Sequence, residues 1–245
     1  SMIIGDAAKL QAIAADSFVE LCKQHTQLAP ETQQTLNALL AVTDTADCQE
    51  ADAMLTSRTL LDLSNQNISD LSPLTFFPQL TSLYLGQNQI SDLAPLATLS
   101  TLNELYLLDN KIADLQPLSQ LQTLQTLQID NNQVQNLEPL TQVTSLTKLY
   151  ANNNQITSLT ALSASSELTE LSLANNQIST LNTIASLTGL TYLNLGGNQI
   201  DNIEPVSQFT QLNELDLSGN NLTQLAALSP LTDLNQLDLR NNPLP

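Results

Sequence analysis

The 245-residue sequence lacks tryptophan and has little of several residue types on which catalysis and nucleic-acid binding depend. It has one histidine, two cysteines and only six lysine and arginine residues against 24 acidic residues, so its net charge is −18. Such a surface repels phosphate groups, which excludes nucleic acid and anionic membrane faces as general partners. No apolar run reaches the ~18 residues of a membrane-spanning helix, and we therefore expect no membrane insertion.

The same scarcity leaves little chemistry for an enzyme. Cys22 and His25 stand three residues apart and could form a nucleophile and base on one helix face, but an oxidised Cys22 would exclude that pair. The sequence has no Gly-rich phosphate loop, no G-x-S-x-G element and no Cys or His pair at zinc spacing. We expect a protein that is not an enzyme, with no catalytic, cofactor or metal site.

What the sequence does contain is leucine at a fixed interval of 22 residues. One position of this period is held by Leu61, Leu83, Leu105, Leu127, Leu149, Leu171, Leu193, Leu215 and Leu237. An asparagine recurs five residues later, at Asn88, Asn110, Asn132, Asn154, Asn176, Asn198, Asn220 and Asn242. Self-similarity at a period of about 20–29 residues predicts a solenoid, in which each unit buries its apolar face against its neighbours.

A single repeat, residues 80–101, shows how one unit is expected to fold. Leu83 and Leu85 alternate with polar positions at period two, which predicts a short strand with one buried face. The asparagine that follows can donate and accept, so stacked copies can pair turn backbone groups that would otherwise be buried alone. Pro95 then fits the start of a short 3₁₀ segment on the convex side.

The pattern L-x-x-L-x-L-x-x-N-x-I-x-D-L-x-P-L-x-x-L at 80–99 and 102–121 resembles the leucine-rich repeats of the 22-residue internalin type of secreted bacterial proteins. The resemblance implies an α/β solenoid, a right-handed arc with a parallel concave sheet, short 3₁₀ or irregular convex segments and a helical N-terminal cap. It also implies adhesion or partner capture. Ala161, Thr183 and Ala227 depart from the pattern by replacing the proline, and Ala151 replaces a strand leucine.

The point at which the repeat begins divides the chain into two regions. Residues 1–57 lack the repeat and are predicted to form a helical cap, with helices near 6–24, 30–42 and 46–55, that covers the first repeat. An independent binding domain is the alternative. Residues 58–245 are predicted to form about nine units, the last incomplete, so either the natural protein continues or the proline-rich end protects the edge.

Cys22 and Cys48 are the two cysteines of the chain, and both lie in the predicted cap. Either they form a disulfide, which would close a loop of about 25 residues and contribute about 3 kcal/mol, or both are reduced and buried. A disulfide implies export, so we expect a secreted, periplasmic or cell-surface protein. Ser1-Met2 resembles a tag-removal scar, and any signal peptide would then be missing from this sequence.

Asp70, Asp92 and Asp114 recur at one repeat position and raise the possibility of a calcium ladder, because this cation takes several oxygen ligands. The equivalent residues in later repeats are Asn136, Ser158, Thr180, Asn202 and Gln224. Short polar residues of mixed charge favour local turn hydrogen bonds over a row of metal sites.

The positions that point outward from the strands carry the variable residues. All four tyrosines fall there, and neighbouring strands about 4.8 Å apart would place Tyr84 beside Tyr106, with Leu108 as an exposed apolar neighbour. The residues that we predict to bind a partner are Tyr84, Tyr106, Leu108, Gln128, Lys148, Tyr150, Glu170 and Tyr192. The negative rim of this strip is Glu104, Asp109, Asp130, Glu170, Asp216 and Asp238, relieved by Lys148 and Arg240. The alternative is that the tyrosines only stabilise the sheet through cross-strand pairs.

Together these features predict a monomeric module that recognises another protein on its concave sheet. The alternative is a structural spacer that self-associates through its uncapped C-terminal end.

Overall fold

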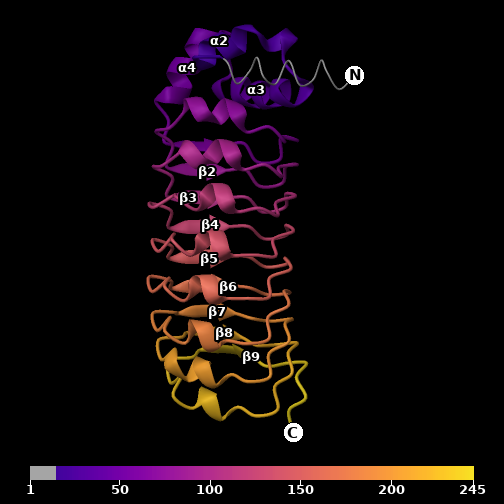
Figure 1. Ribbon diagram of the computed structural model, residues 1–245, viewed down its shortest axis with the longest axis vertical. Coiled ribbons are helices and arrows are strands. Elements are labelled where there is room, and N and C mark those ends of the chain that lie inside the picture. Colours follow the sequence, from indigo (N-terminus) through magenta and orange to yellow (C-terminus); the bar gives the residue numbers. More distant parts are fainter. Residues whose placement is uncertain (1–14) are drawn as a thin grey trace.

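The computed structural model describes residues 15–245 as an elongated stack with helices at one end and strands lying across its long axis, one after another (Figure 1). The helices are α2 (Phe18–Lys23), α3 (Pro30–Thr43) and α4 (Cys48–Thr56), with a 3₁₀ turn, η1 (His25–Gln27), after α2. The strands are β1 (Leu60–Asp62), β2 (Ser82–Tyr84), β3 (Glu104–Tyr106), β4 (Thr126–Gln128), β5 (Lys148–Tyr150), β6 (Glu170–Ser172), β7 (Tyr192–Asn194), β8 (Glu214–Asp216) and β9 (Gln236–Asp238).

These nine strands form one sheet in sequence order, and all eight neighbouring pairs are parallel. The register advances by one repeat at each step, as in the pairing of Leu83 with Leu105. Both of these leucines are fully buried, because each fills the space between its own coil and the next. The predicted leucine-rich-repeat solenoid is confirmed.

A 3₁₀ segment follows each of the first eight strands on the side opposite the sheet. These segments are η2 (Ser72–Phe76), η3 (Ala94–Thr98), η4 (Gln116–Leu118), η5 (Glu138–Leu140), η6 (Thr160–Leu162), η7 (Asn182–Ile184), η8 (Glu204–Gln208) and η9 (Ala226–Leu228). Ala161, Thr183 and Ala227 lie in η6, η7 and η9, so the 3₁₀ turn forms without the proline as well. Ala151 is also fully buried, and the smaller side chain keeps its place in the core.

The recurring asparagine joins consecutive coils. In Asn132, Oδ1 accepts a hydrogen bond from Ile112 N of the preceding repeat at 2.9 Å, while Nδ2 donates to Leu107 O of that repeat and to Ile129 O of its own, both at 3.0 Å. Asn132 is 8% exposed, so water cannot replace these bonds. The predicted role of this residue in pairing turn backbone groups is confirmed.

The residue before the recurring asparagine has a positive φ, which the repeat pattern did not predict. It is Gln87, Asp109, Asn131, Asn153, Asn175, Gly197, Gly219 or Asn241, with φ between 57° and 67°. In the first repeat, where Gln66 stands in place of the asparagine, Asn65 and Asn67 on either side of it have φ of 56° and 54°. The left-handed region is open to glycine and tolerated by asparagine and aspartate, and this turn therefore restricts the residue types that fit.

The N-terminal helices agree with prediction except at the start of α2. The helix expected over 6–24 does not include residues 15–17, because Ser17 adopts an extended conformation and its side chain accepts a hydrogen bond from Glu20 N at 3.1 Å, which caps a helix beginning at Phe18. The rest of that prediction, residues 6–14, lies outside the described residues. The Cys22–Cys48 disulfide is present, with Cα atoms 5.8 Å apart.

The cap is joined to the first repeat by both apolar and polar contacts. Phe18 packs on Phe77 with ring centroids 5.2 Å apart. The hydroxyl groups of Thr32 and Thr35 in α3 donate to Asp70 Oδ2 and to Asp70 O, both at 2.6 Å. One hydrophobic core therefore crosses from cap to array, and the division at residue 57 stays a prediction.

Replacing Asn132 with alanine should lower the free energy of unfolding by about 2–4 kcal/mol, because several buried backbone groups lose their partner at once. Urea unfolding followed by circular dichroism measures this change. The matched control is Gln133→Ala, which alters the neighbouring exposed side chain and should leave stability within about 0.5 kcal/mol. Equal stability of the two variants would mean that the asparagine bonds do not fix the stack.

Candidate functional site

The strands present three rows of outward side chains, which together we call the sheet face. The first row, before the strand leucine, is Leu60, Ser82, Glu104, Thr126, Lys148, Glu170, Tyr192, Glu214 and Gln236. The second, after that leucine, is Asp62, Tyr84, Tyr106, Gln128, Tyr150, Ser172, Asn194, Asp216 and Asp238. The third, two residues further on, is Ser64, Gly86, Leu108, Asp130, Asn152, Ala174, Gly196, Ser218 and Arg240. All eight residues predicted to bind a partner lie in these rows.

Two tyrosines form an aromatic stack in the N-terminal half of the sheet face. Tyr84 and Tyr106 are register partners on β2 and β3, and their rings are stacked with centroids 4.5 Å apart and planes at 11°. The Tyr106 hydroxyl donates to Glu104 Oε2 at 3.1 Å. Stacking holds the two rings in one orientation. Both rings are also partly exposed, which leaves part of their surface available for contact.

Leu108 differs from its prediction because it is partly buried and not an exposed apolar side chain. It leans over Gly86 of the neighbouring repeat, where an added Cβ would lie only 2.6 Å from Leu108 Cδ2. The glycine thus provides the space into which the leucine packs. Leu108 contributes to the wall beside the stacked tyrosines but offers less apolar area than the sequence suggested.

Polar contacts fix the middle of the sheet face. Gln128 Nε2 donates to Asp130 Oδ2 at 2.9 Å, and Gln128 separates Tyr106 from Tyr150 as predicted. The Tyr150 hydroxyl donates to Glu170 Oε2 at 2.5 Å, and Lys148 Nζ lies 3.4 Å from the same oxygen. The bonded side chains are therefore held in place by contacts within the fold.

The hydroxyl groups of Tyr106 and Tyr150 are harder to ionise than a tyrosine in water. Burial raises the pKa of each hydroxyl, and a hydrogen bond to Glu104 or Glu170 raises it further, because the phenolate would face a carboxylate. Both hydroxyls therefore remain protonated donors above the pH at which an ordinary tyrosine ionises.

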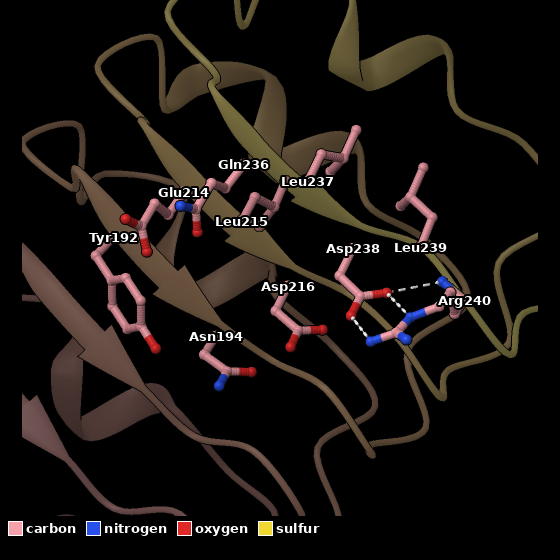
Figure 2. A pocket seen from close by; sticks show the side chains of 10 residues that line it. All are labelled: Tyr192, Asn194, Glu214, Leu215, Asp216, Gln236, Leu237, Asp238, Leu239 and Arg240. Atoms are coloured by element: carbon pink, nitrogen blue, oxygen red, sulfur yellow. Dashed lines mark hydrogen bonds and ion pairs between the residues drawn. The ribbon is translucent and has the colours of Figure 1, made fainter.

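The C-terminal half of the sheet face is hollowed. Figure 2 shows the larger hollow, of about 580 Å³, where Tyr192, Asn194, Asp216 and Asp238 present their polar ends over strands β7 to β9. A second hollow of about 420 Å³ is lined by Tyr150, Glu170, Thr191, Tyr192, Asn213 and Glu214. Glu214, Asn194 and Gln236 were absent from the predicted site and its rim, although their repeat positions match those of residues that were included.

The candidate catalytic and metal residues have structural roles. Cys22 is in the disulfide, which excludes it as a nucleophile, and His25 Nε2 lies 2.7 Å from Asn37 Oδ1. Asp92 Oδ1 accepts from Ala94 N at 2.9 Å, which closes a local turn before η3. The same bond to the residue two positions on is made by Asp70, Asp114, Asn136, Ser158, Thr180 and Asn202. The turn hydrogen bonds predicted at this repeat position are therefore present.

The chain belongs to the leucine-rich repeat family. The family model for leucine-rich repeats in two copies matches residues 59–98, 122–164 and 166–208, and a single-repeat model matches 211–231. No curated protein matches the sequence. In the described residues, every helix is too short or too polar to traverse a bilayer.

Solved structures place the fold among internalins. Internalin C2 of Listeria monocytogenes is similar over 83% of this chain and 91% of its own, at 29% identity and a TM-score of 0.77. The leucine-rich repeat protein LIC12759 of Leptospira interrogans is 28% identical, with a TM-score of 0.70 over 76% of this chain and 49% of that one. The Arabidopsis receptor kinase HAESA, solved with the peptide hormone IDA and the co-receptor SERK1, is 25% identical, with a TM-score of 0.68 over 76% of this chain and 34% of its own. The protein is thus a leucine-rich repeat protein of the internalin type.

Replacing Glu170 with glutamine should bring the pKa of Tyr150 down toward the usual tyrosine value, because the carboxylate facing the hydroxyl is gone. Tyrosinate absorbance during an alkaline titration measures this change, with Glu138→Gln, at an exposed position in η5, as control. The raised pKa also means that stability falls as the pH rises above about 10, where the unfolded chain ionises first, and this loss should be smaller in the variant. An unchanged titration curve would contradict the Tyr150–Glu170 bond.

Proposed function

We propose that the protein recognises another protein through the sheet face, with Tyr84, Tyr106 and Tyr150 as its main contacts. The observation that carries this proposal is the fixed, partly exposed arrangement of the tyrosines: two are stacked at 4.5 Å and the third is bonded to Glu170. Tyrosine is enriched at the energetic centres of protein interfaces, because its ring is large, rigid and both apolar and polar. Side chains already held in one conformation lose little entropy on binding.

The proposal also covers where the protein acts and which kinds of partner and activity it lacks. The disulfide supports export from the cytoplasm, so we propose a secreted, periplasmic or cell-surface protein that acts as a monomer. The net charge of −18 opposes nucleic acid as a partner. We further propose that the module is not an enzyme, since the open face offers no sheltered acid–base pair for catalysis.

The triple variant Tyr84→Ala, Tyr106→Ala, Tyr150→Ala should lose partner binding while remaining folded. Each cross-strand contact contributes about 0.2–1 kcal/mol, so stability should fall by only about 1–3 kcal/mol. Capture of a partner from the native surface or secreted fraction, followed by affinity measurement with the purified partner, tests the binding. Thermal unfolding of the same samples tests the fold.

The matched control is Gln89→Ala, Gln133→Ala, Gln177→Ala, which shortens three exposed side chains on the turns outside the sheet face. It should bind as tightly as the original protein. Loss of folding in the tyrosine variant would show that these rings stabilise the sheet, and full binding in that variant would place recognition elsewhere.

Self-association through the C-terminal end is the second candidate. Leu237 of β9, at the position where earlier strands bury a leucine, is 46% exposed. Because β9 pairs only with β8 among the described strands, a second copy could cover this apolar side chain. Molar mass by light scattering across a concentration series separates the two candidates. We expect the mass of a monomer at every concentration. A mass that rises with concentration in the original protein, but stays that of a monomer in the Leu237→Gln variant, would favour the spacer.

A further inference from the structure

Tyr192 and Glu214 form the boundary between the two hollows of the sheet face. They are register partners on β7 and β8, and both residues line both hollows. Figure 2 shows the Glu214 carboxylate directed toward the Tyr192 side chain. On the other side, the register partner of Tyr192 is Glu170, so the ring stands in one row between two carboxylates.

The sheet face carries seven carboxylates and two cations. Both cations are already paired, Lys148 with Glu170 at 3.4 Å and Arg240 with Asp238 at 2.7 Å. The excess of negative charge gives the face a definite electrostatic preference, which is for a cationic partner.

Six of the seven carboxylates accept hydrogen bonds from neighbouring groups. The donors are Ser64 N to Asp62, Tyr106 to Glu104, Gln128 and Asn152 N to Asp130, Tyr150 to Glu170, Ser218 to Asp216 and Arg240 to Asp238. Glu214 is the exception: within residues 15–245 its carboxylate has no hydrogen bond and no ion pair. Its capacity to accept bonds is therefore free for a ligand.

We propose that the hollows around Tyr192 and Glu214 receive an arginine or lysine side chain from an extended segment of the partner protein. The cationic group binds the Glu214 carboxylate, and the Tyr192 ring provides an aromatic surface for the cation or its aliphatic stem. This inference rests on the proposed function, because it names the chemistry of the partner that the sheet face recognises.

Volume and charge agree with such an occupant. Hollows of about 420 and 580 Å³ are large enough for long side chains, and both open onto the sheet face. A carboxylate offers two oxygens that match the paired N–H groups of a guanidinium. An anionic segment would instead meet four carboxylates across β6 to β9, at Glu170, Glu214, Asp216 and Asp238.

The test uses a peptide of glycine and serine with several arginines, capped at both ends, and the same peptide with glutamine in place of arginine. Amide chemical shifts of isotope-labelled protein are followed during titration with each peptide. We expect the arginine peptide to move resonances of β7 and β8 most and the glutamine peptide to move none of them. Glu214→Gln should weaken binding of the arginine peptide by about five-fold, and Tyr192→Leu should weaken it by about three-fold.

The matched control is Glu167→Gln, which makes the same change of residue and charge at an exposed position outside the sheet face. It should bind the peptide like the original protein. Equal weakening by Glu167→Gln and Glu214→Gln, or shifts spread evenly over the acidic surface, would show general attraction to a protein of charge −18 and would overturn the proposal.

Thermal unfolding should be unchanged in Glu214→Gln, because no bond within the fold is lost. Once a natural partner is in hand, the same variants separate this inference from the broader proposal. If the tyrosine triple variant no longer binds that partner but Glu214→Gln binds it fully, the cationic contact is refuted and the proposed recognition surface stands. Full binding by the tyrosine triple variant would refute the proposed recognition surface.

Discussion

One amide side chain in each repeat after the first, as in Asn132, bonds its own turn to the main chain of the repeat before it. The leucine core supplies the larger driving force for stacking, but burial of apolar surface has no direction and would tolerate small shifts between coils. Hydrogen bonds at 2.9–3.0 Å have both distance and angle requirements. The asparagine therefore turns a stack of similar coils into one with a fixed register.

The sheet face depends on that register. Because the strands advance by whole repeats, residues at one repeat position form a straight row, and their side chains meet at about the strand spacing of 4.8 Å. The 4.5 Å stack of Tyr84 on Tyr106 follows directly from this spacing. The same constraint sets Tyr192 beside Glu214. The backbone sets the geometry of these rows, and the outward side chains can therefore vary without disturbing the repeat.

Much of this arrangement could be predicted from the sequence, because periodicity decides which side chains face inward. The strands, the 3₁₀ segments, the asparagine ladder and the location of all four tyrosines on one face follow from that rule. Features that depend on a specific neighbour could not be predicted in the same way. Leu108 is partly buried because Gly86 in the adjacent repeat leaves space for it, and α2 begins late because Ser17 caps it.

The hydrogen-bond and ion-pair partners of the carboxylates on the sheet face could not be predicted from the sequence either. Repeat position shows that Glu170 and Glu214 point outward, but whether either has a donor depends on the conformation of side chains on neighbouring strands. Only the structure reveals that Tyr150 and Lys148 contact Glu170 and that, within residues 15–245, Glu214 has no such partner. A list of acidic residues therefore identifies the charge of the face without identifying the residue that is free to bind.

This difference separates two electrostatic effects that a net charge of −18 would otherwise merge. At physiological ionic strength the screening length is about 8 Å, so most of the acidic surface attracts a cationic partner from a distance but adds little to the bound state. A direct contact with the partly buried Glu214 carboxylate is screened less than these distant charges. In the proposed complex, charge across the whole molecule would raise the rate of encounter, whereas selectivity for a basic side chain would depend on the local contact with Glu214 and Tyr192. Added salt should therefore slow association of the cationic partner with every variant. It should not change the difference in affinity between the original protein and Glu214→Gln to the same extent, because that difference comes from the local contact.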